Sequence, residues 1–251
     1  MGEIWKDFCE EMTKEFQKAT PHLIPHRLTE FIDLMDDDED YCGDRILFWE
    51  KWLVKTRAPV AMLLVKEYED VDDYFKRGYN QTARNRLRHA RKAGYRCRVM
   101  TAEERNDRLD ELYEINTSKE IRQGRPMREN YRRYPEKAKE PEFHCKLHFD
   151  KLYGCFTKED KWVGYISGNF CGELAAVAQI LGHGDYMKDD FMYLLWYYFI
   201  EDIMDNIPNV KYVIYSQWLD GTDGLRYWKR SVGLKPVITS QDRMSYGYWG
   251  G

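Results

Sequence analysis

Residues 173–181, ELAAVAQIL, and residues 210–218, VKYVIYSQW, are the two strand-forming stretches that decide the fold. Both are rich in the apolar, β-branched or aromatic side chains that favour strands. The segment between them contains FMYLLWYYFIEDIM (191–204), which is apolar around most of a helix circumference. We therefore expect a helix over about 191–206 that is buried between layers. A strand, a helix and a strand in this order predict a crossover unit of the βαβ type.

Further strand patterns precede this unit, and a helix pattern follows it. The stretches FHCKLHF (143–149), KLYGCFT (151–157) and WVGYISGNF (162–170) are separated by short turns, which is typical of antiparallel neighbours. After the unit, DGLRYWKRSVGL (223–234) predicts a short helix. The predicted fold class is therefore α/β, with a mixed, mostly antiparallel sheet flanked by helices.

The first 57 residues have a different pattern, because their tryptophans lie among apolar residues at helix-like spacing. We expect a helical N-terminal extension over residues 1–57 and one α/β domain over residues 58–251. The domain begins with APVAMLLV (58–65), a candidate buried strand. A helix is predicted next over about 71–93, and it ends at Gly94. Another helix begins at Thr101, which has Glu104 at capping-box spacing.

Positive charge is concentrated in one segment. Between Lys76 and Arg98 there are nine Lys or Arg residues and no acidic residue, although the whole chain has a net charge of -4. We predict that this segment binds a phosphate-bearing substrate or nucleic acid, because Lys and Arg side chains neutralise and contact phosphate groups. A solvated helix face is an equally good interpretation. The residues predicted for this role are Arg84, Arg88, Arg91 and Lys92.

A second pair of arginines lies in the segment RQGRPM (122–127). Arg122 and Arg125 flank a glycine there, and a proline follows them. A rigid loop that presents forked guanidinium donors suits a carboxylate or a phosphate. The alternative is a surface turn that is tied to local acidic residues.

Composition argues against several classes of protein. The longest apolar stretch, residues 191–200, is about half as long as a membrane span requires. The N-terminus is charged where a signal peptide has an apolar run. We therefore expect a cytoplasmic protein without a membrane span. Six scattered cysteines indicate reduced thiols, and because no zinc-ligand spacing occurs, including around His144 and His148, we expect no metal.

The order of elements over residues 142–238 resembles the C-terminal half of the GNAT superfamily of acyltransferases. The ending GLRYWKRSVGLKP (224–236) is similar to that superfamily's final helix, with Gly233 and Leu234 in its closing position. The resemblance implies a sheet in which two adjacent strands splay apart. It also implies that the acyl donor and the acceptor meet in the gap between those strands.

A narrower resemblance is to the Fem family, the aminoacyl-tRNA-dependent transferases that share this fold. The run RNRLRHARKAGY (84–95) is similar to the basic helix of that family. Trp228 and Lys229 match a Phe-Lys pair that lies four residues before a glycine, here Gly233. This resemblance implies a role for Lys229 at the oxyanion or the leaving group.

GNAT proteins that use acetyl-CoA carry a Gln/Arg-x-x-Gly-x-Gly/Ala loop at the start of their central helix. The corresponding loop here, before the helix predicted over 191–206, departs from that pattern. In GHGDYMKDDF (182–191), Gly182 and Gly184 give loop freedom, and Lys188 is placed to meet a phosphate. Asp189 and Asp190 lie at the predicted helix N-terminus, however, where they would cap the helix and repel an anion. The donor is therefore predicted to be either an acyl-CoA or an aminoacyl-tRNA.

Aminolysis of an acyl ester or thioester needs a deprotonated amine and hydrogen-bond donors for the oxyanion. His183, between two glycines, is the imidazole best placed to act as a base, and Asp185 could orient it. Capping of a turn is an equally good role for this histidine. Glu173 and Tyr215, on the two predicted strands, are weaker candidates.

Three functional hypotheses follow. The first is an N-acyltransferase that works by direct attack of the amine on the acyl carbon. The second keeps the fold and modifies bases of phage DNA. The third is a non-catalytic module of the same fold that binds RNA, a nucleotide or a partner protein.

Overall fold

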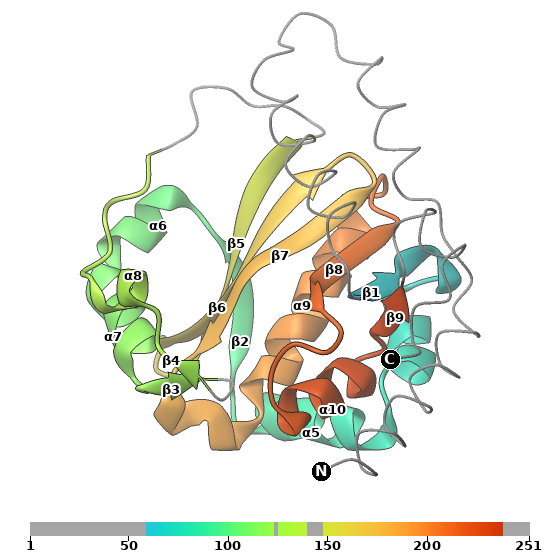
Figure 1. Cartoon of the computed structure of the whole chain (residues 1–251), viewed down its shortest axis with the longest axis horizontal. Helices are drawn as coiled ribbons and strands as arrows, with labels where there is room; N and C mark the ends of the chain where they lie inside the picture. Colours follow the sequence, from blue (N-terminus) through green and yellow to red (C-terminus); the bar gives the residue numbers. More distant parts are fainter. Residues whose placement is uncertain (1–58, 123–124, 140–147, 238–251) are drawn as a thin grey trace, which may run out of the picture.

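The computed structural model describes residues 59–122, 125–139 and 148–237, so the predicted extension over residues 1–57 lies outside the described part. Within it, seven strands form one sheet (Figure 1). In sheet order they are β2 (Arg96–Met100), β5 (His148–Phe156), β6 (Trp162–Cys171), β7 (Leu174–Gly182), β8 (Tyr212–Gln217), β1 (Val60–Leu64) and β9 (Lys235–Val237). All neighbours are antiparallel except β7 and β8, which confirms the predicted mixed, mostly antiparallel sheet.

Helices cover this sheet from both faces. The α-helices are α4 (Val71–Asp73), α5 (Gln81–Lys92), α6 (Ala102–Asp107), α7 (Leu109–Thr117), α8 (Glu129–Arg132), α9 (Phe191–Asn206) and α10 (Asp223–Ser231). Shorter helical turns are η2 (Val65–Glu67), η3 (Tyr74–Gly78) and η4 (Gly184–Asp189), and β3 (Ile121–Arg122) pairs with β4 (Arg125–Pro126) in a small hairpin. No helix in the described ranges combines the length and apolar character that a bilayer crossing demands.

The central helix α9 joins β7 to β8 and confirms the predicted crossover, with the predicted bounds. Its Trp196, Phe199 and Ile203 are fully buried against the sheet. Helix α5 packs beside it through an apolar stripe that includes Leu87 and Ala90, both also fully buried. In Figure 1 α6, α7 and α8 stand together at the β2 side of the sheet, where Leu112 and other residues form a separate cluster with Trp162.

The sheet splits between β7 and β8. These strands pair only at Leu174–Ala176 with Tyr212–Ile214, although β7 continues to Gly182. Each strand is irregular just beyond the paired part. In β7, Ala178 has no partner in the register with β6, and in β8 the register with β1 shifts near Ser216, whose φ is 54°. Such bulges bend a strand and increase its twist, so they carry the two strands apart.

Two predicted elements are wrong. The predicted continuous helix over 71–93 breaks after Gly78, because the backbone of Tyr79 is extended, with φ -78° and ψ 130°. Helix α5 then starts anew at Asn80, whose side chain accepts a hydrogen bond from the backbone N–H of Ala83 at 2.9 Å. The predicted turn near residue 150 is also absent, since β5 runs without a break from 148 to 156.

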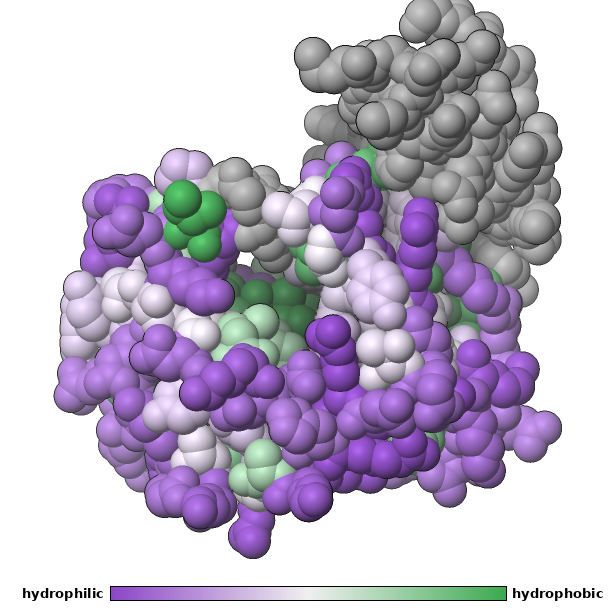
Figure 2. Space-filling model, turned by 90° about the horizontal axis from the view of Figure 1, so that it is seen from below, coloured by the Kyte–Doolittle hydropathy of each residue, from purple (hydrophilic) through white to green (hydrophobic). Residues whose placement is uncertain are grey.

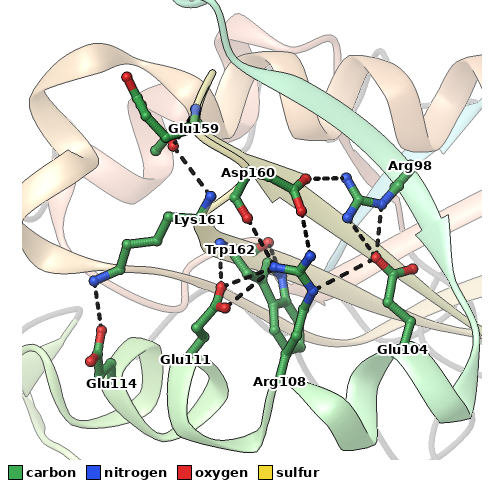
Figure 3. Close-up of polar contacts among 11 residues, drawn as sticks. Arg98, Glu104, Arg108, Glu111, Glu114, Glu159, Asp160, Lys161 and Trp162 are labelled. Carbon is green, nitrogen blue, oxygen red and sulfur yellow. Dashed lines mark hydrogen bonds and ion pairs between the residues drawn. The ribbon is translucent and has the colours of Figure 1, made fainter.

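A polar network fixes α6 and α7 to the sheet (Figure 3). Asp160 lies in the turn between β5 and β6 and accepts hydrogen bonds from Arg98 of β2, at 2.9 Å, and from Arg108. Glu111 of α7 accepts a hydrogen bond from the backbone N–H of Trp162 at 2.5 Å. Because α7 leads directly into β3, this network also positions the hairpin beside the end of β7.

Candidate functional site in the split of the sheet

A cavity of about 360 Å³ lies at the opening between β7 and β8. It is lined from β7 by Gly182, from β8 by Tyr215 and from α10 by Trp228. The remaining lining residues are Arg86, Lys119, Ile121, Arg122, Ile180, Leu181, Met187, Asp190, Met192, Tyr193, Thr222, Gly224 and Leu225. Figure 2 shows a hollow on the lower face, with hydrophobic residues at its floor and hydrophilic residues around it. The turn after β7 and the predicted Trp-Lys helix thus face one crevice, at Gly182 and Trp228.

Arg122 clamps the end of β7 to α7. Its Nη1 donates to the carbonyl oxygen of Gly182 at 2.6 Å, and its Nη2 donates to the carbonyl of Ile115 at 2.6 Å and to Oγ of Ser118 at 2.8 Å. Nε is buried and has no hydrogen-bond partner. Burial lowers the pKa of this guanidinium. No carboxylate in the described part of the chain forms an ion pair with it, so a cation stands at the cavity without a counter-ion.

Aromatic rings form the opposite wall. The rings of Tyr215 and Trp228 meet edge to face, with centroids 5.7 Å apart, and Trp228 makes a similar contact with Trp196 at 5.2 Å. Such geometry is favoured by the ring quadrupoles. Trp196 belongs to the buried face of α9, so the cavity wall is continuous with the core. Tyr215 lines the cavity from β8, and its role in catalysis stays a prediction.

Asp190 occupies the N-terminal end of α9 at the rim of the cavity. It has a left-handed backbone with φ 61°, and its carboxylate lies 3.5 Å from Nη1 of Arg86 and 3.1 Å from Nδ1 of His89. The neighbouring Asp189 accepts a hydrogen bond from the hydroxyl of Tyr95 at 2.7 Å. The two carboxylates thus connect α9 to α5 and to the residue before β2. An anion would meet Asp190 at the helix N-terminus.

His183 is buried just behind the cavity and does not line it. Its Nδ1 accepts a hydrogen bond from the backbone N–H of Asp185 at 3.3 Å, so the neutral ring carries its proton on Nε2. Burial lowers the pKa of the imidazole. The contact with Asp185 runs through the backbone, while the Asp185 side chain is exposed. This arrangement matches the turn-capping alternative, and action as a base would require the Asp185 contact to open.

Lys229 is fully buried, and its Nζ is directed at backbone carbonyls. It donates to the carbonyl oxygens of Gln217 at 2.5 Å, Trp218 at 3.3 Å and Asp220 at 3.0 Å. Nζ also lies 5.5 Å from the ring centroid of Tyr215. Because Lys229 does not line the cavity, these contacts support a role in holding the backbone that follows β8, rather than the predicted direct role at the oxyanion or leaving group.

Glu173 lies at the other end of β7, next to the paired part of the split. Its Oε1 forms an ion pair with Lys211, and its Oε2 is buried without a hydrogen-bond partner. The backbone carbonyl of Glu173 accepts hydrogen bonds from Lys211 and Tyr212 at 2.8 and 3.1 Å. The structure therefore places Glu173 where the two strands are joined and does not bring it to the cavity.

The predicted phosphate-binding face is divided between structural and exposed residues. Arg84 donates to the carbonyl oxygens of Lys76 and Tyr79 at 2.7 and 2.6 Å, so it closes the turn before α5. The guanidinium of Arg88 lies over the ring of Phe75, and that of Arg91 lies over the ring of Tyr197. The exposed residues are Arg88, Arg91 and Lys92. Arg125 is in β4.

The predicted glycines serve close packing more than ligand approach. A Cβ on Gly182 would lie 2.7 to 2.9 Å from atoms of Phe191, Met192 and Met187. Gly184 donates its backbone N–H to Oγ of Ser118 at 2.9 Å. Lys188 is exposed on η4. In the described residues, no group of three or more His, Cys, Asp or Glu side chains is arranged to hold a metal ion. His144, around which no metal was expected, lies outside the described residues.

Sequence reasoning missed three lining residues that bear directly on the chemistry of the cavity. Arg86 was passed over because it lies between the arginines of the predicted basic stripe. Lys119 belongs to no motif, and Leu225 lies in the GLRYWK stretch but was given no role. The only available signal was position, because Lys119 closely precedes Arg122, and Leu225 lies at helical spacing from Trp228.

Comparisons with known proteins give structural similarity only. No family model and no curated protein matches the sequence. FemX is similar with a TM-score of 0.49 and 8% identity, over 71% of this chain and 60% of its own. A conserved protein of unknown function from Bacteroides thetaiotaomicron VPI-5482 has a TM-score of 0.47 and 16% identity, and the match covers 78% of this chain and 65% of that protein. A tandem GNAT protein from the clavulanic acid biosynthesis pathway has a TM-score of 0.46 and 13% identity, and the match covers 72% of this chain and 51% of that protein. This chain thus spans less than two thirds of each of these longer chains, and similarity at this level does not bear on activity.

Proposed function

We propose that the protein is an N-acyltransferase whose substrates meet in the cavity between β7 and β8. The carrying observation is the split itself: two parallel strands pair over three residues and then part around a cavity. A concave site with an apolar floor and a few convergent polar groups is the usual form of a small-molecule site. The GLRYWKRSVGLKP resemblance and the parting of the strands point to the same chemistry.

The open edge of β7 supplies groups that suit acyl transfer. Beyond Ala176 this strand pairs with β6 but not with β8, so the backbone N–H groups on its β8 side take no part in pairing with β8. Backbone N–H groups held by a rigid strand are good donors to a developing oxyanion, because they need no reorganisation during the reaction. We assign the oxyanion to this edge, in place of Lys229, and give Lys229 the task of positioning Tyr215 and the loop after β8.

The amine is proposed to attack the acyl carbon directly. The new C–N bond forms as the bond from the acyl carbon to the leaving sulfur or oxygen breaks, and the ammonium proton is lost to a base. His183 follows the lining residue Gly182 in the sequence. Its Nδ1 would accept this proton after the hydrogen bond from the backbone N–H of Asp185 is replaced by one from the substrate amine. The donor is an acyl-CoA or an aminoacyl-tRNA, and the exposed Arg88, Arg91 and Lys92 would meet its phosphates.

The test is an acyl-transfer assay with the full chain. Acyl-CoA thioesters of increasing length and a set of aminoacyl-tRNAs are each incubated with a panel of primary amines, and new amides are detected by mass spectrometry. The proposal expects amide formation with at least one donor class and a loss of at least tenfold in His183→Gln. Absence of any amide across the panel would count against an acyltransferase.

A further inference from the structure

The cavity has more positive charge than its own carboxylate can neutralise. Arg86, Lys119 and Arg122 line it, and Asp190 is the one acidic residue among the lining residues. Asp190 is already engaged by Arg86 and by His89, at 3.5 and 3.1 Å. Within the described ranges, neither Lys119 nor Arg122 has an ion-pair partner. The excess positive charge therefore lies on the side formed by α7 and β3.

Packing holds Lys119 close to this side of the cavity. Its methylene groups lie across Gly184, where an added Cβ would be only 2.8 Å from Cγ and 2.9 Å from Cε. The backbone N–H of Gly184 is in turn bonded to Ser118, whose Oγ also contacts Arg122. One small turn therefore brings the stem of Lys119 and the guanidinium of Arg122 to the same side of the cavity. Two cations on one side of a cavity suit an anionic group.

Most of the other lining residues are apolar, and they extend out to the rim. Ile180 and Met192 are half-buried, as is Leu225 on α10. At the mouth, Ile121 is 65% exposed and Met187 is 41% exposed. These are two of the four large hydrophobic side chains that are exposed in the described residues. Exposed apolar side chains that gather at one cavity mark a ligand surface more often than a solvent surface.

We propose that one substrate of this cavity is an amphipathic anion. Its aliphatic chain lies against Ile180, Met192 and Leu225, and its carboxylate or phosphate lies at Lys119 and Arg122. This inference rests on the proposed function only in using the same cavity. It makes Lys119 a binding residue, and it makes a short acyl group such as acetyl a poor fit, because acetyl would leave most of the apolar wall in contact with water.

Binding is tested by isothermal titration calorimetry of the full chain. The probes are octyl phosphate, octanoate, acetate, inorganic phosphate and octyltrimethylammonium. At least one octyl anion is expected to bind ten times more tightly than acetate, phosphate or the octyl cation. Whichever octyl anion binds more tightly identifies the anionic group as phosphate or carboxylate. Equal binding of the octyl anions and the octyl cation, or no binding of either octyl anion, would overturn the inference.

Variants then separate the two parts of the site. Lys119→Ala should weaken binding of the octyl anion about fivefold, because it removes an exposed cation and leaves the fold intact. Leu225→Ser should weaken this binding about tenfold, because it removes contacts with the ligand's aliphatic chain. Lys158→Ala, at an exposed lysine beside Glu159 in the β5–β6 turn, is the matched control and should bind like the wild type. A loss as large in Lys158→Ala as in Lys119→Ala would overturn the assignment.

The outcome is separable from that of the proposed function. Tight binding of octyl anions without any amide formation would retain this inference and count against acyl transfer. Amide formation from acetyl-CoA that is unaffected by Lys119→Ala and by Leu225→Ser would retain acyl transfer and overturn the amphipathic anion.

Discussion

The Nζ atom of Lys229 lies 3.0 Å from the backbone carbonyl oxygen of Asp220, in a position from which solvent is excluded. Two further carbonyls, of Gln217 and Trp218, also accept hydrogen bonds from the ammonium group. A buried ammonium is costly unless hydrogen bonds compensate it, and here the end of β8 and the following loop provide them. The lysine thus ties α10 to the strand that carries Tyr215.

Lys229→Met tests this structural role. The variant keeps most of the side-chain volume and removes the Nζ donor from three carbonyls, of which that of Gln217 also accepts the backbone N–H of Asp220. It should destabilise the protein by about 1–3 kcal/mol. Urea unfolding followed by circular dichroism measures the change. Full stability together with a loss of acyl transfer would instead support direct catalysis by the ammonium group.

The pKa of His183 gives a prediction for pH dependence. Burial lowers the pKa of its imidazole, so the unfolded chain, with a value near ~6.5, binds the proton more readily than the folded chain. Stability from this residue is therefore present above pH ~6.5 and is lost as pH falls through the lowered folded pKa. Nitrogen-15 NMR should show the Nε2–H tautomer at pH 7 and titration below pH ~6.5. An Nδ1–H tautomer would contradict the hydrogen bond from Asp185.

Asp190 is predicted to weaken the binding of phosphates at the α9 N-terminus. Asp190→Asn keeps a residue that tolerates the left-handed backbone and removes the negative charge. Binding of CoA, measured by calorimetry, should tighten by about three- to tenfold, with a change in stability below about 1 kcal/mol because the ion pairs are partly exposed. Asp185→Asn, on the exposed part of η4, is the control. Unchanged or weaker CoA binding in Asp190→Asn would show that this carboxylate does not oppose anions.

Asp160 combines an ion-pair role with a special backbone. Its φ is 64°, and hydrogen bonds from Arg98 and Arg108 lower the pKa of its carboxyl group. The charged form therefore contributes stability at neutral pH that is lost as pH falls below ~3.8 through the lowered pKa. Asp160→Asn should cost about 1 kcal/mol or less, since the side chain is half-exposed. Asp160→Ala should lower the free energy of unfolding by about 1–2 kcal/mol more than Asp160→Asn, because alanine disfavours the left-handed backbone. Urea unfolding measures both variants, and equal midpoints would contradict this prediction.

Local patterns in the sequence predicted the elements that depend on local physics. The bounds of α9 follow from its apolar circumference, and the start of α6 follows from Thr101, whose hydroxyl accepts a hydrogen bond from the backbone N–H of Glu104 at 3.0 Å. Gly94 ends α5 with a φ of 88°, as predicted. The break after Gly78 was missed because a single glycine inside a helical pattern is tolerated and does not by itself predict a helix end. The short strand β9 was missed because it exists through pairing with β1.

The candidate site was predicted in outline and not in detail. The family resemblance implied two splayed strands with a substrate gap between them, and the split between β7 and β8 holds a cavity that Gly182 and Trp228 line. The direction of the side chain at position 229 could not follow from spacing, because it depends on where the loop after β8 lies. Lys119 and Arg86 could not be singled out either, since surface cations are common and only the folded chain brings these two to the cavity.

Gly224 offers the most direct test of the cavity as the substrate site. It lines the cavity, and an added Cβ would find only Oγ1 of Thr222 nearby, at 3.8 Å, so a side chain can extend there without strain. Gly224→Ala should stabilise α10 by about 0.5–1 kcal/mol and leave room for a ligand. Gly224→Phe should fold equally well but fill the opening.

The decisive measurement compares acyl transfer by Gly224→Phe and Gly224→Ala, with thermal unfolding of both proteins as the folding control. We predict that Gly224→Phe loses at least tenfold in kcat/KM with an unfolding temperature no lower than that of the wild type, while Gly224→Ala retains activity. A folded Gly224→Phe protein that transfers acyl groups as fast as Gly224→Ala would contradict the placement of the reaction between β7 and β8.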